Sequence, residues 1–149
     1  MQVFIIGTPF ETASILDKRR LNKQIIECKQ ILQALSGESK AWSNHPAIIQ
    51  YRSHQMWLID YMKCLAAYQE GNMFSAQMFS AACEHIKPFW HCQDYFDQMK
   101  RRLYTKDPVF YADFAELGTS EVNWYFVNNQ WKEYMNGKII GVRDFTLKN

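Results

Sequence analysis

The segment LDKRRLNKQIIECKQIL, residues 16–32, places a run of cationic side chains ahead of one carboxylate, Glu27. Arg20, Lys23 and Glu27 are spaced i, i+3, i+7 and therefore share one face of a helix. Cations at the positive end of a helix repel one another, and a bound phosphate relieves that repulsion. The alternative is a solvated helix face with a Lys23–Glu27 pair worth at most about 0.5 kcal/mol, which the charge pattern alone favours. The cations considered as phosphate contacts are Lys18, Arg19, Arg20 and Lys23.

A second segment, AWSNHPAIIQYRSHQMW at residues 41–57, concentrates aromatic and basic side chains. Aromatic faces stack on bases, and Arg and His contact phosphates or base edges. The alternative, helix capping plus core aromatics, is favoured by composition alone. The candidates are Trp42, Asn44, His45 and Tyr51 as walls of a base pocket, and Arg52 as a phosphate contact.

A third cluster lies in MKRRLYTKDPVFY, residues 99–111, where Arg102 and Lys106 are further candidate phosphate contacts. Because cations suit the C-terminus of a helix, a solvated helix end also explains this cluster.

Metal and cofactor chemistry is not expected. The Cys and His residues of CEHIKPFWHC, residues 83–92, lack the spacing of zinc ligands. The chain contains no GxxxxGK[ST], GxGxxG, HExxH or GxSxG motif, which removes the commonest phosphate-loop, dinucleotide, zincin and serine-hydrolase interpretations. Chemistry based on one carboxylate and an amine is still open.

Helices are the elements that must position these side chains. MQVFII reads as extended, and a helix is expected to begin near Thr12 or Ser14, with Ser14 and Asp17 as a loose capping box, and to end at Gly37. A second helix is expected to be capped by Asn44 or His45, to have Pro46 as its first residue and to end at Gly71. Further helices are expected over 74–86 and 90–103, and another helix is expected to begin at Asp107-Pro108. The segment WYFV-NN-WKEYM is expected to form a hairpin or an aromatic coil.

Composition agrees with a globular helical protein. The chain has 149 residues, of which 48% are hydrophobic and 15% aromatic. We expect an all-α, compact single-domain bundle over 1–149, with about 137–149 as a tail. The net charge of +2 does not indicate a nucleic-acid binder, so that case depends on local clusters. Free thiols, no secretory signal and no membrane-spanning stretch predict a soluble, cytoplasmic protein.

Three elements in this order resemble the pyrimidine-dimer DNA glycosylase/AP lyase family, the phage-type endonuclease V repair enzymes. They are LDKRRLNKQIIECKQIL, WSNHPAI and RRLYTKDPVFY. The resemblance is closest to a short branch of that family and covers roughly the first 60 residues and a patch near 100–111. It implies a compact all-α fold that binds DNA, double-stranded in our expectation, excises a damaged pyrimidine and cleaves the backbone at the abasic sugar.

The resemblance also implies roles for individual residues. The family's nucleophile is the α-amine of its own chain, which forms a Schiff base with C1′ of the sugar, and a glutamate on the first helix is the acid–base partner. Glu27 falls at the matching position. α-Amines of model peptides have a pKa of about 7.7–8.0, so roughly 10–20% is unprotonated at pH 7, against about 0.04% for a lysine.

The chain departs from the family at its start. A threonine follows the initiator methionine in the characterised enzymes, whereas Gln2 follows here. So bulky a side chain normally leaves Met1 in place, and the expected amine is that of Met1. Two alternatives are open: a non-catalytic nucleic-acid-binding module on the same fold, and a protein-interaction factor such as a phage-encoded inhibitor. If the protein is phage-encoded, the expected location is the host cytoplasm.

Overall fold

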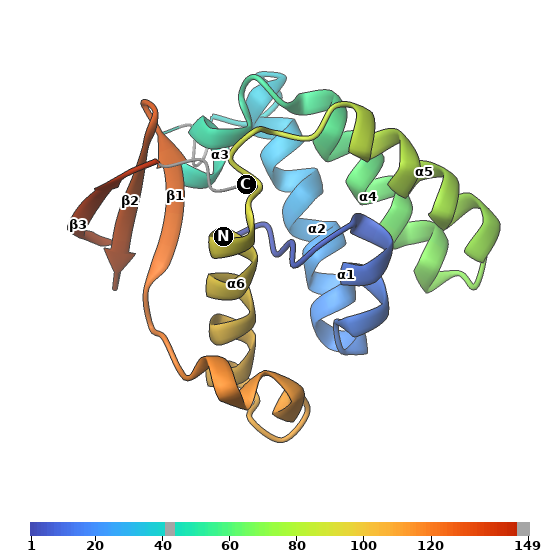
Figure 1. Ribbon diagram of the computed structural model, residues 1–149. Helices are drawn as coiled ribbons and strands as arrows, with labels where there is room; N and C mark the ends of the chain where they lie inside the picture. The colour runs from blue at the N-terminus through green and yellow to red at the C-terminus, as the bar shows by residue number, and fades with distance from the viewer. Residues whose placement is uncertain (41–43, 146–149) are drawn as a thin grey trace. The chain divides into compact units, whose positions relative to one another are not determined.

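A computed structural model describes residues 1–40 and 44–145, which divide into two compact units (Figure 1). The first unit is Met1–Pro88 and the second is Phe89–Asn149. Each unit is described by itself. The protein is predominantly helical, as expected, but it is not all-α, because the second unit contains a three-stranded antiparallel sheet.

The first unit is built from an extended N-terminal segment and helices. The helices are α1 (Pro9–Ile15), α2 (Lys18–Leu35), α3 (Pro46–Tyr51), α4 (Gln55–Gln69) and α5 (Met73–His85). Its core includes a stack of Tyr51 on Trp57 and of Trp57 on Tyr61, with ring centroids 5.6 and 4.9 Å apart. All three rings are almost completely buried. The aromatic content of this segment therefore serves the core.

The first expected helix is two helices. Thr8 caps α1, since its Oγ1 accepts from the amide of Glu11 at 3.1 Å. Leu16 then adopts extended backbone, and the carboxylate of Asp17 caps α2 by accepting from the amide of Arg20 at 3.4 Å. The Ser14–Asp17 capping box was therefore wrong. Asp17 caps the second helix directly, which fixes the direction of the basic segment that follows.

The helix expected from Pro46 to Gly71 is also divided, at Arg52–His54. Its predicted start is confirmed: Nδ1 of His45 accepts from the amide of Ala47 at 3.1 Å, and Pro46 is the first helical residue. α5 agrees with the predicted 74–86 within one residue at each end.

The second unit begins with α6 (Gln93–Lys106), three residues later than predicted at each end. Asp107 does not start another α-helix. Its Oδ1 accepts from the amide of Phe110 at 3.0 Å and closes a turn, after which a 3₁₀ helix covers Ala112–Leu117.

The sheet contains β1 (Asn123–Val127), β2 (Gln130–Met135) and β3 (Lys138–Asp144), in that order. Asn128 and Asn129 join β1 to β2 with φ of 55° and 60°, as a two-residue hairpin loop requires. Asn136 and Gly137, with φ of 53° and 76°, join β2 to β3 in the same way. The hairpin alternative is thus confirmed, and residues 138–144, expected in a tail, form the third strand.

Candidate functional site

The extended N-terminal segment is anchored along the helices of the first unit. The side chains of Val3, Ile5 and Ile6 are buried, so the segment is part of the core. Because no strand pairs with it, side chains satisfy its backbone groups. Thr12 Oγ1 accepts from the amide of Ile6 at 3.1 Å, and the hydroxyl of Tyr61 donates to the carbonyl of Phe4. The start of the chain is therefore held in a defined place.

Gln24 of α2 makes the closest set of contacts to this segment. Its Oε1 accepts from the amide of Phe4, and its Nε2 donates to the carbonyl of Gln2 at 2.9 Å. The same Nε2 lies 3.3 Å from Oε2 of Glu27. Gln24 is only 2% exposed, so these bonds form away from solvent. One buried amide thus connects the chain start to the candidate carboxylate.

Glu27 lies directly against the beginning of the chain. Its Oε2 accepts from the amide of Gln2 at 3.4 Å, and its Oε1 is 3.9 Å from Nζ of Lys23. The Glu27 side chain is 15% exposed whereas that of Lys23 is 71% exposed. A merely solvated ion pair would leave both groups in water. The carboxylate is instead largely withdrawn from solvent and faces the first two residues.

The electrostatics of neighbouring groups agree with this placement. The pKa of His45 is lowered, first by burial and then by the positive α-amine of the chain. Nδ1 of His45 already accepts a backbone hydrogen bond, so the neutral ring carries its proton on Nε2. The pKa of the Cys28 thiol is raised by burial and, to a smaller extent, by the charge of Glu27. Cys28 is consequently a neutral thiol.

The cations of α2 differ in their surroundings. Lys18, Arg19 and Lys23 are exposed. Arg20 is half-buried, and its Nη1 pairs with Oδ1 of Asp17 at 3.1 Å within the cap of the helix. Lys18 and Arg19 extend into solvent, whereas Lys23 also lies 3.9 Å from Oε1 of Glu27, and Arg20 has a structural role.

The predicted base-pocket residues are not all at one surface. Tyr51 is fully buried and stacks on Trp57, so it occupies a core position. Asn44 is exposed, and His45 is half-buried at the start of α3. Trp42 lies outside the described residues. Of this set, His45 is the residue with an electrostatic connection to the α-amine.

Arg52 belongs to a separate depression of about 380 Å³ between the end of α3 and the start of α4. Its lining also includes His54 and Trp57, whereas Glu27 does not line it. Burial lowers the pKa of His54, which keeps this imidazole neutral at pH 7.

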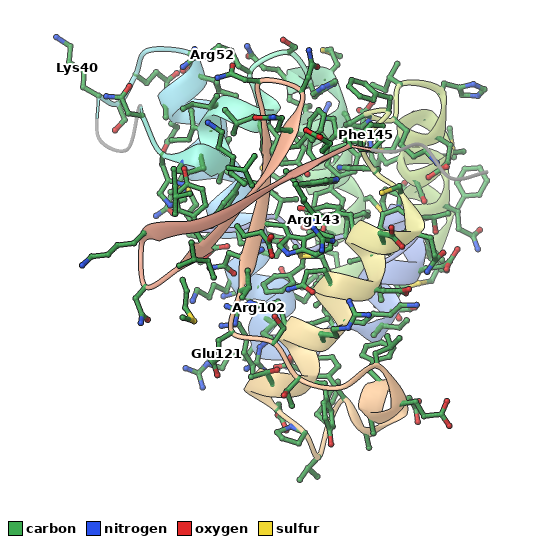
Figure 2. The ribbon with its side chains drawn as sticks, turned by 60° about the vertical axis from the view of Figure 1, so that its left-hand side comes forward. Lys40, Arg52, Arg102, Glu121, Arg143 and Phe145 are labelled. Atoms are coloured by element: carbon green, nitrogen blue, oxygen red, sulfur yellow. The ribbon has the colours of Figure 1, made fainter. Side chains whose placement is uncertain are left out.

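Arg102 and Lys106 are on α6 of the second unit. Arg102 is 9% exposed, and its Nη1 donates to the carbonyl of Ser120 at 3.2 Å. Burial lowers the pKa of Arg102, and the charge of Glu121 opposes that shift. Figure 2 labels both residues, close to the segment that leads into β1. Arg102 therefore holds the chain that leads into the sheet, while Lys106 is exposed at the end of its helix.

Sequence reasoning missed Gln24 and Tyr61. Gln24 is three residues from both Leu21 and Glu27, so its position between the apolar stripe and the acid was a detectable signal. Nothing in the sequence relates Tyr61 to Phe4, because the two are 57 residues apart.

Residues 1–40 and 44–145 contain no group of three or more His, Cys, Asp or Glu arranged to hold a metal ion. None of the helices described is long and apolar enough to cross a membrane.

Comparison with known proteins identifies one family. The family model described as pyrimidine dimer DNA glycosylase matches residues 1–69. The match includes the N-terminal segment, α2 with Glu27, and His45, and it confirms the resemblance for this part of the chain. The element at 101–111 lies outside it. No curated protein and no solved structure matches the chain.

Proposed function

We propose, on the premise that residues 1–69 are similar to the pyrimidine dimer DNA glycosylases, that this protein is a DNA glycosylase acting on a damaged or modified pyrimidine, with an associated lyase activity. The observation that carries the proposal is the contact between Glu27 and the chain start, with 3.4 Å from the amide of Gln2 to Oε2. An amine at residue 1 and a shielded carboxylate are the two groups that imine chemistry at a sugar requires.

The proposed reaction uses these groups in sequence. The α-amine of Met1 attacks C1′ of the target nucleotide, the bond from C1′ to the base breaks, and the base leaves with a proton. The bond from C1′ to O4′ then breaks as the sugar ring opens, and the proton that the nitrogen loses passes to O4′, which gives a Schiff base between the protein and C1′. Glu27 stabilises the cationic sugar and transfers these protons. Removal of a proton from C2′ then expels the 3′ phosphate.

DNA is the proposed partner. The exposed cations of α2, Lys18, Arg19 and Lys23, are suited to phosphates on either side of the target nucleotide. Extruding a base from the stack costs a few kcal/mol, and contacts to the flipped nucleotide must recover that energy. His45 supports the proposal, because a neutral imidazole beside the α-amine adds no further positive charge there. Trp42 and Asn44 are the other proposed pocket residues, and Arg20, Arg52 and Lys106 the other proposed phosphate contacts. Tyr51 and Arg102 are left out of the proposal because both side chains are buried in the protein.

Borohydride trapping tests the proposal. The protein is incubated with UV-irradiated duplex DNA, and separately with duplex containing one abasic site, in the presence of sodium borohydride, which reduces a Schiff base to a stable adduct. We expect an adduct from the wild type, loss of at least about tenfold in the trapping rate for Glu27→Gln, and no change for Glu38→Gln, an exposed glutamate beyond the same helix.

The outcomes separate the two activities. Adducts with abasic DNA only would support the lyase and contradict excision from UV-damaged DNA. If neither DNA gives an adduct and the protein still binds duplex DNA with an affinity that falls as salt rises, the protein is a non-catalytic DNA-binding module and the proposed enzyme activity is wrong. Peptide mapping of the adduct must locate the sugar on residue 1, and a sugar on a lysine would contradict the proposed nucleophile.

A further inference from the structure

Gln24 is a buried amide with partners on both sides of the proposed site. It lies on α2, about one helical turn before Glu27, and contacts the N-terminal segment and α4, which packs beside α2 (Figure 1). Because Gln24 is only 2% exposed, its polar atoms must find their partners inside the protein. The identity of those partners indicates what the side chain does.

The amide of Gln24 uses its full hydrogen-bonding capacity. A primary amide has two N–H donors on its nitrogen and two lone pairs on its oxygen. Oε1 accepts from the backbone amide of Phe4, and the hydroxyl of Tyr61 lies 3.5 Å from the same oxygen. Nε2 has two acceptors, the carbonyl of Gln2 at 2.9 Å and Oε2 of Glu27 at 3.3 Å. Turning the amide over would set its oxygen against a carbonyl and a carboxylate, so the orientation of the amide is determined.

The carboxylate of Glu27 is held through one of its two oxygens. Oε2 lies 3.4 Å from the backbone nitrogen of Gln2 and 3.3 Å from Nε2 of Gln24. Oε1 lies 3.9 Å from Nζ of the exposed Lys23, and residues 1–40 and 44–145 record no other partner for this oxygen. The oxygen that is left for a substrate is therefore Oε1.

The nitrogen of the same amide also places the start of the chain. Nε2 of Gln24 holds the carbonyl of Gln2, and Oε2 of Glu27 holds the backbone amide of Gln2, so both backbone groups of this residue are fixed. Only Cα and the carbonyl carbon of Met1 separate that amide from the α-amine. Reactions between held groups depend on their geometry, and a displacement of about 1 Å can lower a rate by about 10²-fold.

We propose, as an inference that rests on the proposed glycosylase and lyase function, that Gln24 is a positioning residue for the reaction. Its Nε2 joins Glu27 to residue 2, so that the carboxylate and the α-amine meet the sugar in one arrangement. Gln24 acts through these two groups, and its effect is on the rate of the covalent step and not on the affinity for DNA. Glutamine is required because an ionised glutamate has no hydrogen to donate and methionine neither donates nor accepts as an amide does.

Single-turnover borohydride trapping tests the proposal on duplex DNA that contains one abasic site, with the protein in excess over the DNA and its concentration varied. The experiment gives the trapping rate at saturation and the protein concentration at half-saturation. Gln24→Met and Gln24→Glu should each lower the saturating rate about tenfold or more and leave the half-saturating concentration within about twofold of the wild type. Gln24→Glu is the more specific variant, because it keeps an acceptor for the amide of Phe4 and loses the donor of Nε2.

The controls are Gln30→Met and Gln30→Glu, the same two changes at an exposed position of α2, and both should trap DNA like the wild type. Far-UV circular dichroism identical to the wild type establishes that each variant is folded.

Nuclear magnetic resonance of the free protein tests the hydrogen bond to Glu27 without any DNA. The side-chain NH2 signals of Gln24 are identified by their absence in the Gln24 variants. These protons should exchange with water more slowly than those of the exposed Gln30. One of the two should move upfield in Glu27→Met, which removes the charged acceptor.

The outcomes separate this inference from the function on which it rests. If the wild type forms adducts and the folded Gln24 variants trap DNA at the wild-type saturating rate, the positioning role is wrong and the proposed function stands. A loss confined to the half-saturating concentration also overturns the positioning role, because it assigns Gln24 to DNA binding. Side-chain protons of Gln24 that exchange as fast as those of Gln30 and do not respond to Glu27→Met overturn it on structural grounds. A wild type that forms no adduct overturns the proposed function, and the positioning role with it.

Discussion

Replacement of Gln24 by methionine is the strongest test of how the chain start is held. Methionine has a similar length and fills the buried space, but it neither donates nor accepts as the amide does. The substitution removes the acceptor for the amide of Phe4 and the donor to the carbonyl of Gln2, a bond of 2.9 Å. It also removes the 3.3 Å contact to Glu27.

The size of the effect follows from the two backbone groups left without partners. Each buried group that loses its hydrogen bond costs about 1–3 kcal/mol. Methionine is more favourably buried than glutamine, which offsets part of this cost, so we expect a net loss in the free energy of unfolding of about 3 kcal/mol. For a chain of this size that corresponds to a fall in melting temperature of about 6–12 °C. Gln30→Met on the exposed side of α2 is the matched control and should change stability by less than about 0.5 kcal/mol.

Calorimetry measures the melting temperature, and amide hydrogen exchange localises the effect. Exchange at Phe4 and at neighbouring amides of the N-terminal segment should accelerate in Gln24→Met, while amides of the sheet in the second unit should not change. If Gln24→Met is as stable as Gln30→Met, or if Phe4 exchanges at the wild-type rate, then the amide does not tether the chain start and the reasoning about the site fails.

Three further predictions concern charge. For His45→Asn, which keeps a capping side chain, the loss of stability between pH 7 and pH 5 should be smaller than in the wild type. Because the pKa of His45 is lowered in the folded protein, the unfolded chain binds the proton first as the pH falls below about 6.5, and the folded state loses stability. Urea unfolding at the two pH values measures this loss, and His85→Asn, at an exposed histidine, is the control. Burial raises the pKa of Cys64 to about 11, so iodoacetamide should not modify Cys64 in the native protein at pH 8, whereas the half-buried Cys92 should react. Mass spectrometry after digestion measures the labelling of each cysteine, and equal labelling of the two would contradict the burial of Cys64. Arg19→Ala should reduce the slope of log binding constant against log salt for duplex DNA by about 0.9, and an unchanged slope would remove this residue from the DNA contact.

The sequence was informative where local chemistry decides the structure. Pro46 after His45 predicted a helix start, and the Asn128-Asn129 pair between aromatic runs indicated a hairpin. Such signals depend on backbone conformations that only a few residue types favour. The bounds of α5 were predicted for the same reason. Residues 138–144 were missed because the strand contacts solvent on much of its surface and shows no clear apolar alternation.

Only the tertiary structure decided what surrounds Glu27. The spacing of Arg20, Lys23 and Glu27 establishes a shared helix face, but it does not distinguish a solvated face from a site. The distinction depends on the packing of residues 1–7 against α2 and α4, which brings the amide of Gln2 to the carboxylate. Contacts between residues 25 positions apart, as these are, leave no periodic trace in the sequence. Helix caps are set by neighbours along the chain, whereas the surroundings of a buried acid are set by whichever distant segments the core draws together.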